Sequence, residues 1–462
     1  MASDWATSGV DLHLEVDRTH LRRSLEDSLR SAVRDGRLVP GVVLPPSRAL
    51  ARDLQVARNT VADAYGQLVA EGWLESRQGS ATRVAAVPPA ARAARVDSAA
   101  QARGPAYDLR PGRPDVSGFP RTAWATAVRE VLAQLPSEAL GYGDARGRVE
   151  LRTALAEYLG RARGVRTDPA CVVVCSGYAE ALWLLGRALR ARGVRAAGVE
   201  AYGHQRHRAV LSDAGLRLDA VEVDEEGARV SALGAAGAVV LTPAHQFPLG
   251  WALSPDRRLE LVGWARDSGA VVIEDDYDAE FRYDRRAVGA LQPLAPDVVV
   301  HAGTASKTLA PAVRLAWLAL PPSLVDDVVA QRELLARETP VIDQLALARL
   351  LVSGRYDRHV RRSRLAYARR RESFVAALDR HAPAVEVIGL AAGLHSVVRL
   401  APGDEEEAAV ARAAARDVAI EGLASYSAPG FSQPPSVVVG WGGAPPHTVT
   451  TALRRLALAL GG

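Results

Sequence analysis

The chain has 462 residues, of which 48% are hydrophobic, so it can form two or three domains and is too apolar for global disorder. Its net charge of +4 does not by itself identify a nucleic-acid-binding protein, and two cysteines argue against a disulfide scaffold. No stretch approaches about 18 uninterrupted apolar residues, and the first residues lack the apolar core of a secretion signal. We therefore expect a cytoplasmic protein.

Residues 18–86 contain three helical patterns followed by a hairpin pattern. Leucine, valine and alanine recur at helical spacing in residues 18–35, 47–54 and 58–72. The sequence WLESRQGSATRV, at 73–84, then predicts a β-hairpin whose tip is Gly79-Ser80. This order of elements predicts a winged helix-turn-helix.

In a winged helix, the start of the third helix enters the major groove of DNA. Arg58, Asn59 and Thr60 occupy that start, and arginine and asparagine can each make paired hydrogen bonds to a base edge. Arg48, in the second helix, could bind a phosphate, and Gly79-Ser80 could reach the minor groove. A small helical dimerisation or docking domain is the alternative.

A linker and a larger domain follow. Residues 87–107 are rich in Ala, Pro and Arg and show no apolar period, which indicates a linker. Within residues 108–462, runs such as CVVVC and AVVIEDD alternate with amphipathic helices. This alternation predicts an α/β fold with a large, parallel-type sheet buried on both faces. The last part mixes Arg-rich helices with strands such as LHSVVRL, which predicts a smaller α+β domain.

Lys307 is the only lysine among the 57 lysine and arginine residues. Compositional drift explains why arginine replaces lysine on a surface, where either cation serves. Arginine, however, cannot lose its proton and attack a carbonyl, whereas a lysine of lowered pKa can. Lys307 is therefore a candidate nucleophile, and a leftover surface lysine is the alternative.

The strand in VVIEDDYDAEF ends in acidic residues, at the edge where an open α/β sheet binds ligands. Pyridoxal phosphate needs an acid at its ring nitrogen and a lysine at its aldehyde. Asp275 suits the ring nitrogen and Tyr277 the ring hydroxyl. A solvated acidic loop or a divalent-metal site is the alternative for this acidic cluster, although we assign no metal ligand.

Phosphate donors are expected where a strand turns into a helix. Ser176, Gly177 and Tyr178 occupy such a turn after CVVVC. The short segment around Lys307 supplies three further candidates, which are Thr304, Ser306 and Arg314.

Two resemblances extend this interpretation. The segment LPPSRALARDLQVARNTVADAYGQLVAEGWLESRQGSATRV resembles the GntR-type winged helix. Residues 108–462 resemble the fold type I aminotransferases through LGYGDARGRVELRTALAEYL, VVVCSGYAEAL, LTPAHQFPLG, VIEDDYDAEFRYD and GTASKTLAPAVRLAWL. A chain that joins the two resembles the MocR/GabR family of transcriptional regulators.

The resemblance implies a role for several residues of the larger domain. Lys307 matches the Schiff-base lysine, Asp275 the ring-nitrogen acid and Tyr277 the donor to the ring hydroxyl. Phosphate contacts are implied for Thr304, Ser306 and Arg314. Tyr142 matches an aromatic residue that reaches the phosphate of the partner subunit.

Other positions depart from the family pattern or have rival interpretations. In EAYGH, His204 takes the place of the aromatic residue stacked on the cofactor ring, and Tyr202 is its rival. Arg206 aligns with an arginine that contacts an amino-acid carboxylate, and a surface arginine is the alternative. The final strand, PSVVVGW, lacks the usual carboxylate-binding arginine, so Arg399 is the nearest substitute. Glu180 stands where many relatives have glutamine, and we assign it no role.

The resemblance implies a regulator that binds double-stranded DNA and pyridoxal 5′-phosphate. Its aminotransferase-like domain would sense the cofactor, or an amine or amino acid, as an aldimine. Relatives form head-to-tail homodimers, and the linker is long enough for that arrangement. An active aminotransferase with an accessory winged helix is the alternative, and whether any turnover remains is open.

Overall fold

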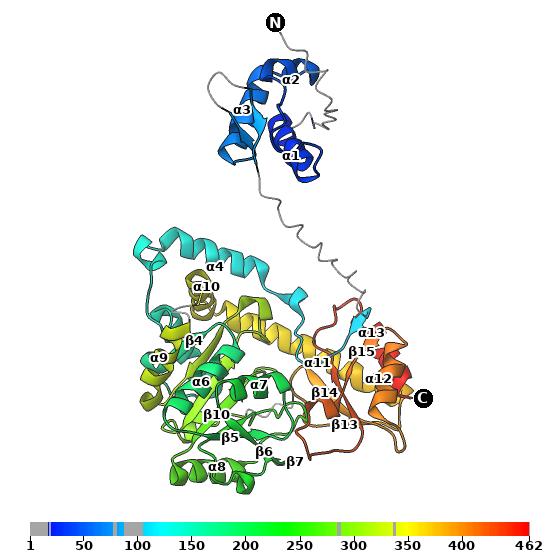
Figure 1. Ribbon diagram of the computed structural model, residues 1–462. Coiled ribbons are helices and arrows are strands. Elements are labelled where there is room, and N and C mark those ends of the chain that lie inside the picture. Colours follow the sequence, from blue (N-terminus) through cyan, green and yellow to red (C-terminus); the bar gives the residue numbers. More distant parts are fainter. Residues whose placement is uncertain are drawn as a thin grey trace. The chain divides into compact units, whose positions relative to one another are not determined.

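The computed structural model describes residues 17, 20–76, 81–86, 105–283, 288–335 and 339–461. The chain divides into two compact units, Met1–Gly104 and Pro105–Gly462 (Figure 1). The expected hairpin tip, Gly79-Ser80, lies outside the described residues. Within the described ranges, none of the helices has the length and apolar composition needed to cross a bilayer.

The first unit has three helices and a small antiparallel pair of strands, drawn in blue in Figure 1. Its elements are α1 Leu21–Arg34, α2 Ser47–Asp53, α3 Arg58–Ala70, β1 Leu74–Glu75 and β2 Arg83–Val84. Side chains at helical spacing, among them Leu29, Leu50 and Leu68, form one core. The buried hydroxyl of Tyr65 donates to the Pro45 carbonyl at 3.0 Å, which fixes α3 against the segment before α2. This order is the predicted winged helix-turn-helix.

A seven-stranded sheet forms the centre of the second unit, in the order β4-β12-β11-β10-β9-β5-β6. The strands are β4 Val172–Cys175, β5 Ala196–Glu200, β6 Arg217–Val221, β9 Ala238–Leu241, β10 Val271–Asp276, β11 Val299–Thr304 and β12 Ala316–Ala319. A separate small hairpin pairs β7 Val223–Asp224 with β8 Gly227–Ala228. Alternation of apolar strands and helices thus produces the expected α/β fold.

Strand β12 is antiparallel to both of its neighbours, β11 and β4, whereas the other pairs in the sheet are parallel. A parallel return needs a crossover of a dozen or more residues, usually a helix. Only residues 305–315 separate β11 from β12, and they contain no α-helix. The sheet is therefore mixed, because this connection is too short for a crossover.

Helices cover both faces of the sheet, as strand β4 illustrates. Val172 and Val174 pack into one cluster, and Val173 and Cys175 pack into another, because successive side chains of a strand point to opposite faces. The first face is covered by α4 Arg121–Gln134, α5 Val149–Arg163, α8 Pro255–Ser268 and α10 Val341–Val352. The second face is covered by α6 Tyr178–Ala191, α7 Gln205–Asp213 and α9 Val325–Leu335.

The smaller domain follows the long helix α11, Arg355–His381. Its antiparallel sheet has the order β13-β14-β17-β16. These strands are β13 Glu386–Ile388, β14 His395–Arg399, β16 Glu421–Gly422 and β17 Ser436–Gly440. A short parallel pair joins β15 Val418–Ala419 to β3 Tyr107–Asp108, and α12 Glu406–Ala414 and α13 Val449–Leu460 complete the core with α11. This is the expected α+β domain.

Candidate functional site

A cavity of about 180 Å³ lies at the ends of several strands of the large sheet. One buried water needs only roughly 10–15 Å³, so the cavity has room for a small-molecule ligand. The polar and aromatic residues around it are Tyr178, Glu200, Tyr202, His204, His207, Arg208, Thr242, Phe247, Asp275, Tyr277, Thr304, Ser306 and Lys307, and Gly112 also lines it. Strand ends in an α/β sheet are the usual place for a ligand.

The amine of Lys307 is held inside this cavity. Its Nζ donates a hydrogen bond to the Gly112 carbonyl at 2.6 Å. Burial lowers the pKa of Lys307 below its ordinary value, although Asp278 and Asp275 oppose this effect. A lowered pKa increases the neutral fraction of the amine, which is the form that attacks a carbonyl.

Asp275 is a buried carboxyl near the end of β10. Burial raises its pKa well above the ordinary value, and the nearby charges of Asp276, Glu200 and Asp278 add to this effect. The Tyr178 hydroxyl opposes the shift, but it is itself buried and makes no hydrogen bond of regular geometry within the described residues. A protonated ring nitrogen beside Asp275 would offset the burial of this carboxylate, so the donor set fits a pyridinium ring.

Tyr277 also reaches the cavity, but its hydroxyl already has a partner. It lies 2.9 Å from Nδ1 of His245, and the same nitrogen lies 3.0 Å from Oδ2 of Asp278. His245 and Asp278 are both buried. This Tyr-His-Asp chain orients the ring of Tyr277 beside Asp275. The assignment of Tyr277 to the ring hydroxyl of a cofactor stays a prediction.

His204 lies beside Lys307. A Cβ on Gly112 would be 3.6 Å from Lys307 Nζ and 3.9 Å from His204 Nε2, so the two side chains meet over this glycine. The imidazole stacks on Phe247 with ring centroids 4.1 Å apart and 19° between planes. Burial, with a smaller contribution from Lys307, lowers the pKa of His204 to about 4, which keeps the ring neutral at pH 7. Its rival Tyr202 also lines the cavity but packs in a buried apolar cluster.

The predicted phosphate donors form two neighbouring groups. Ser176 and Gly177 lie between β4 and α6, and a Cβ on Gly177 would be 3.0 Å from Nη1 of Arg314. The guanidinium of Arg314 therefore packs directly on the Ser176-Gly177 turn. The Thr304 hydroxyl is 3.0 Å from the Ser306 hydroxyl and accepts the Ser306 amide at 3.1 Å. Thr304, Ser306 and Tyr178 line the cavity, whereas Ser176, Gly177 and Arg314 are not among its lining residues. Hydroxyls, a cation and a helix start are the groups that bind phosphate, so the assignment of these residues to a phosphate stays a prediction.

Two predicted effector residues lie outside the cavity. Arg206 is exposed and lines a second hollow beside it, together with Arg110 and Arg113. Arg399 is tied to Glu386 by an ion pair of 2.6 Å. It stands four residues along β14 from His395, so about 13 Å of strand separates it from the side chains that pack on Phe247. The structure does not bring Arg399 to the cavity, because its side chain is used by the neighbouring strand.

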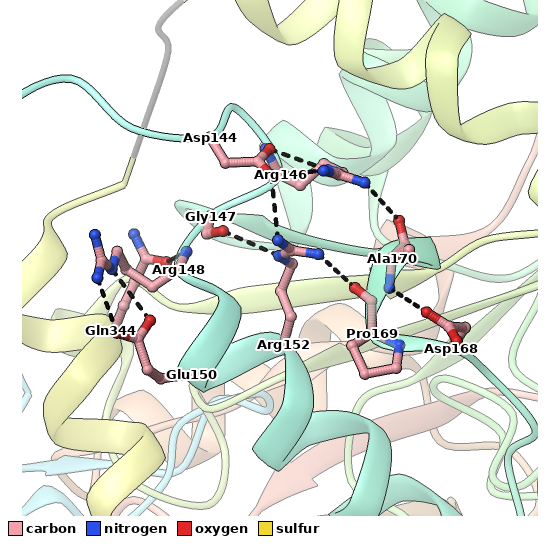
Figure 2. Close-up of polar contacts among 10 residues, drawn as sticks. All are labelled: Asp144, Arg146, Gly147, Arg148, Glu150, Arg152, Asp168, Pro169, Ala170 and Gln344. Carbon is pink, nitrogen blue, oxygen red and sulfur yellow. Dashed lines mark hydrogen bonds and ion pairs between the residues drawn. The ribbon is translucent and has the colours of Figure 1, made fainter.

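Tyr142 is not among the residues that line the cavity either, and it is 89% exposed. Figure 2 shows the segment that follows it, where Arg146 and Arg152 converge on Asp144. These ion pairs are 2.7 Å and 3.1 Å long, and Arg152 also donates to the carbonyls of Gly147 and Pro169. The loop that presents Tyr142 is thereby fixed to the start of α5. Its role toward a partner subunit stays a prediction.

In the first unit, the predicted DNA-reading residues share one end of α3. Arg58 and Asn59 are its first two residues and are exposed, and Thr60 is half-buried. Arg48 is exposed in the first turn of α2. These positions leave the polar ends of the side chains accessible, as contact with DNA requires.

Several cavity residues escaped the sequence-based prediction. Gly112, His207 and Phe247 line the cavity, and Glu200 is buried beside it, where burial raises its pKa to about 7. Phe247 belongs to the motif LTPAHQFPLG, which carries a resemblance but no spacing that marks the residues facing a ligand. Gly112 has no side chain and gives no signal, because its contribution is a carbonyl.

Each of the two units matches a known protein family. The family described as "Aminotransferase class I and II" matches residues 112–431, and the bacterial regulatory proteins of the gntR family match residues 14–84. The probable rhizopine catabolism regulatory protein MocR of Rhizobium meliloti is 32% identical over 95% of this chain and 93% of its own. The chain belongs to the MocR family of GntR-type transcriptional regulators.

Other similar proteins are also transcriptional regulators or aminotransferases. The pyridoxine biosynthesis transcriptional regulator PdxR of Corynebacterium glutamicum is 32% identical, with 96% of each chain covered. Among solved structures, the α-aminoadipate aminotransferase LysN of Thermus thermophilus, complexed with N-(5′-phosphopyridoxyl)-L-leucine, is 25% identical. It covers 76% of this chain and 91% of its own, with a TM-score of 0.68. The predicted fold class and family are confirmed, and family membership supports pyridoxal phosphate as the cofactor.

Proposed function

We propose that this MocR-family chain regulates transcription by coupling DNA binding to the occupancy of its aminotransferase-like cavity. The observation that carries the proposal is the presence, in one chain, of exposed Arg58 and Asn59 on a GntR-type helix and of Lys307 and Asp275 in one cavity. Residues 18–86 would bind DNA, and residues 87–107 would link this domain to the larger one. Residues 108–462 would sense pyridoxal phosphate, or an amine or amino acid. The protein would act in the cytoplasm as a head-to-tail homodimer.

The cavity residues have distinct roles in this proposal. Pyridoxal phosphate, when bound, supplies an aldehyde that condenses with amines and a ring that withdraws electrons. Lys307 provides the amine for attachment, and the Gly112 carbonyl orients it. Asp275 holds a proton at the ring nitrogen, and His204, supported by Phe247, offers a flat neutral face. Ser176, Gly177, Thr304, Ser306 and Arg314 hold the phosphate.

An amine or amino acid that displaces Lys307 would change the contacts in the cavity and so the conformational equilibrium of the chain. Arg206, Arg110 and Arg113 line the adjacent hollow, and they outnumber its one lining carboxylate, Glu421, although Arg110 and Arg113 both pair with Asp108. This charge suits an effector that carries a carboxylate. Activation and repression are equally compatible with such a coupling.

The test is a titration of candidate amines and amino acids against the visible absorbance of the cofactor-loaded full chain. It is repeated with a DNA fragment selected from random-sequence DNA by the same protein. We expect the effector to change DNA affinity by the factor by which DNA changes effector affinity, because linkage is reciprocal. Purified protein without visible absorbance, or the absence of any such coupling, would refute the proposal.

Turnover as an aminotransferase is the second candidate, favoured by the fold shared with LysN. Against it stands the lack of an arginine in β17, where aminotransferases commonly bind the substrate carboxylate and this chain has Val437 and Val438. Steady-state conversion of an amino acid and a keto acid that disappears in Lys307→Ala would establish this activity.

A further inference from the structure

Arg332, in α9, is a fully buried cation without a regular hydrogen bond. Its exposed fraction is 0%, and its Nε, Nη1 and Nη2 atoms find no partner within the described residues. A buried guanidinium normally satisfies its five N–H donors, because leaving them unpaired is costly. This arginine therefore needs an explanation beyond packing.

The counter-charge of Arg332 is Glu180, in the first turn of α6. Oε1 of Glu180 lies 3.6 Å from Nη1 of Arg332, within ion-pair distance but too far for a hydrogen bond. Cys175 also lies close to Arg332, which favours its thiolate, but burial outweighs this effect and raises the pKa of the thiol to about 12, so the thiol is neutral. The carboxylate of Glu180 is itself only 14% exposed.

The two carboxylate oxygens of Glu180 have different neighbours. Oε1 faces Arg332, and Oε2 accepts a hydrogen bond from the backbone amide of Ser176, in the Ser176-Gly177 turn. This is the turn on which Arg314 packs and which would hold the phosphate of the cofactor. The carboxylate thus occupies an amide donor at the start of a helix, where an anion is favoured.

The carboxylate and a phosphate compete for this position. A phosphate bound at the Ser176-Gly177 turn would accept from the amide that Glu180 occupies, and two anions so close would repel in a poorly solvated site. A movement of about 1 Å would bring Glu180 to the roughly 2.8 Å of a charge-assisted hydrogen bond with Arg332. That movement would give the guanidinium a hydrogen bond that it lacks and would weaken the contact between Glu180 and the Ser176 amide.

We propose that Glu180 competes with the cofactor phosphate for the Ser176 amide, and that Arg332 receives the Glu180 carboxylate when phosphate binds. The proposal rests on the proposed function, because it takes the Ser176-Gly177 turn as the phosphate site. While Glu180 holds the Ser176 amide, the turn cannot bind phosphate. The apparent affinity for pyridoxal phosphate therefore falls as the fraction of chains with this contact rises. Such an adjustment sets the cofactor concentration at which the sensor becomes loaded.

A purely structural pair would behave differently. If Glu180 only caps α6 and Arg332 only joins α9 to α6, changes at either residue would alter stability without distinguishing ligands that carry a phosphate. The comparison of pyridoxal 5′-phosphate with pyridoxal, which has the same aldehyde and no phosphate, separates these two cases.

The experiment measures both affinities by visible absorbance on the full chain after removal of bound cofactor. In Glu180→Gln, which keeps the size of the side chain, we expect pyridoxal phosphate to bind on the order of fivefold more tightly, because a neutral acceptor competes less well than a carboxylate. Pyridoxal should bind as it does to the unchanged protein. Equal effects on both ligands, or none on either, would overturn the proposal.

A double-mutant cycle tests the role of Arg332. Arg332→Met should weaken pyridoxal phosphate binding when residue 180 is glutamate. In the Glu180→Gln background it should leave the binding unchanged, because there is no carboxylate at residue 180 to pair with Arg332. The double variant also removes both buried charges, which favours folding. An equal loss in the two backgrounds would overturn the role of Arg332. If the unchanged protein bound no pyridoxal phosphate, the proposed function itself would fail.

Discussion

At the start of α3, Arg58 and Asn59 are adjacent and exposed, whereas the groups around the cavity are buried and come from segments as distant as Gly112 and Lys307. In the first region, the side chains contribute little to the core beneath them. In the second, Asp275, His204 and Lys307 all have pKa values shifted by burial, so each group depends on its neighbours. Changes at the exposed residues Arg58 and Asn59 should therefore affect recognition alone, and changes in the cavity should affect both binding and stability.

The largest effect is expected at Lys307. Lys307→Ala removes the only side-chain amine, so covalent attachment of pyridoxal phosphate and its visible absorbance should be lost completely. Lys307→Arg is the matched control, because it keeps the positive charge but cannot lose a proton. It should lose the absorbance as well. Retention of the absorbance in either variant would show that Lys307 is not the attachment point.

A substitution in the core of the first unit tests whether the two units unfold independently. Leu68 in α3 is 0% exposed, so Leu68→Ala should lower the free energy of unfolding of that unit by about 2–5 kcal/mol and impair DNA binding. Cofactor absorbance should persist unchanged, because the second unit has its own cores. Parallel thermal melts followed by circular dichroism and by visible absorbance measure both.

Val39, 53% exposed in the same unit, offers the control for this experiment. Val39→Ala should change the unfolding free energy by less than about 0.5 kcal/mol. Simultaneous loss of cofactor absorbance in Leu68→Ala would mean that the two units do not unfold separately.

Arg58→Ala should weaken binding to the selected DNA fragment by about 1–3 kcal/mol and relax the preference for one base pair, with no effect on the melting temperature. Arg22→Ala is the matched control, because this arginine of α1 is also exposed and, among the residues that the structure describes, forms an ion pair with Glu26 of its own helix alone. It should change affinity by less than about twofold. Equal losses in the two variants would indicate a purely electrostatic contact.

The smallest effect concerns pH. The pKa of His204 is about 4 in the folded chain, whereas an unfolded histidine titrates near about 6.5. Between these values the unfolded chain binds more protons, so the free energy of unfolding falls as the pH falls through that window. At pH 5, His204 should contribute a loss of at most about 2 kcal/mol relative to pH 7.

His204→Phe should remove that part of the acid sensitivity and retain the stacking on Phe247. Urea unfolding of the second unit at pH 7 and pH 5 measures it, with exposed His447→Phe as the control. His207, whose pKa is lowered to about 3 mainly by burial, should keep some acid sensitivity in every variant. Identical pH dependence in the unchanged and His204→Phe chains would contradict the assignment.

Local patterns were sufficient to predict much of the fold. Apolar residues at helical spacing identified α1 and α3, and the apolar runs identified β4 and β10, because these signals lie within one element. The direction of β12 is different, since AWLA reads like the parallel strands around it. Only the length of the connection to β11 determines its direction, and the sheet order is needed to see that.

The site was predictable to the extent that its residues lie near strand ends in recognisable motifs. Lys307, Asp275, Tyr277 and His204 meet that condition, and the structure brings them together in one cavity. The prediction for Arg399 lacked support because a strand position says nothing about a partner such as Glu386. The contact between Glu180 and Arg332 joins two helices far apart in the chain, so no sequence spacing could indicate it.

Because Lys307 is the single lysine of the sequence, its chemical modification can report whether the cavity holds a ligand. An amine-specific acylating reagent has two kinds of target, the α-amine of a chain and, among the side chains of these 462 residues, Lys307 Nζ alone. Because the second of these lies inside the cavity, its modification should depend on whether a ligand holds or shields it. Intact mass would then count loaded and empty chains directly, in a mixture and beside DNA, without any substitution in the protein.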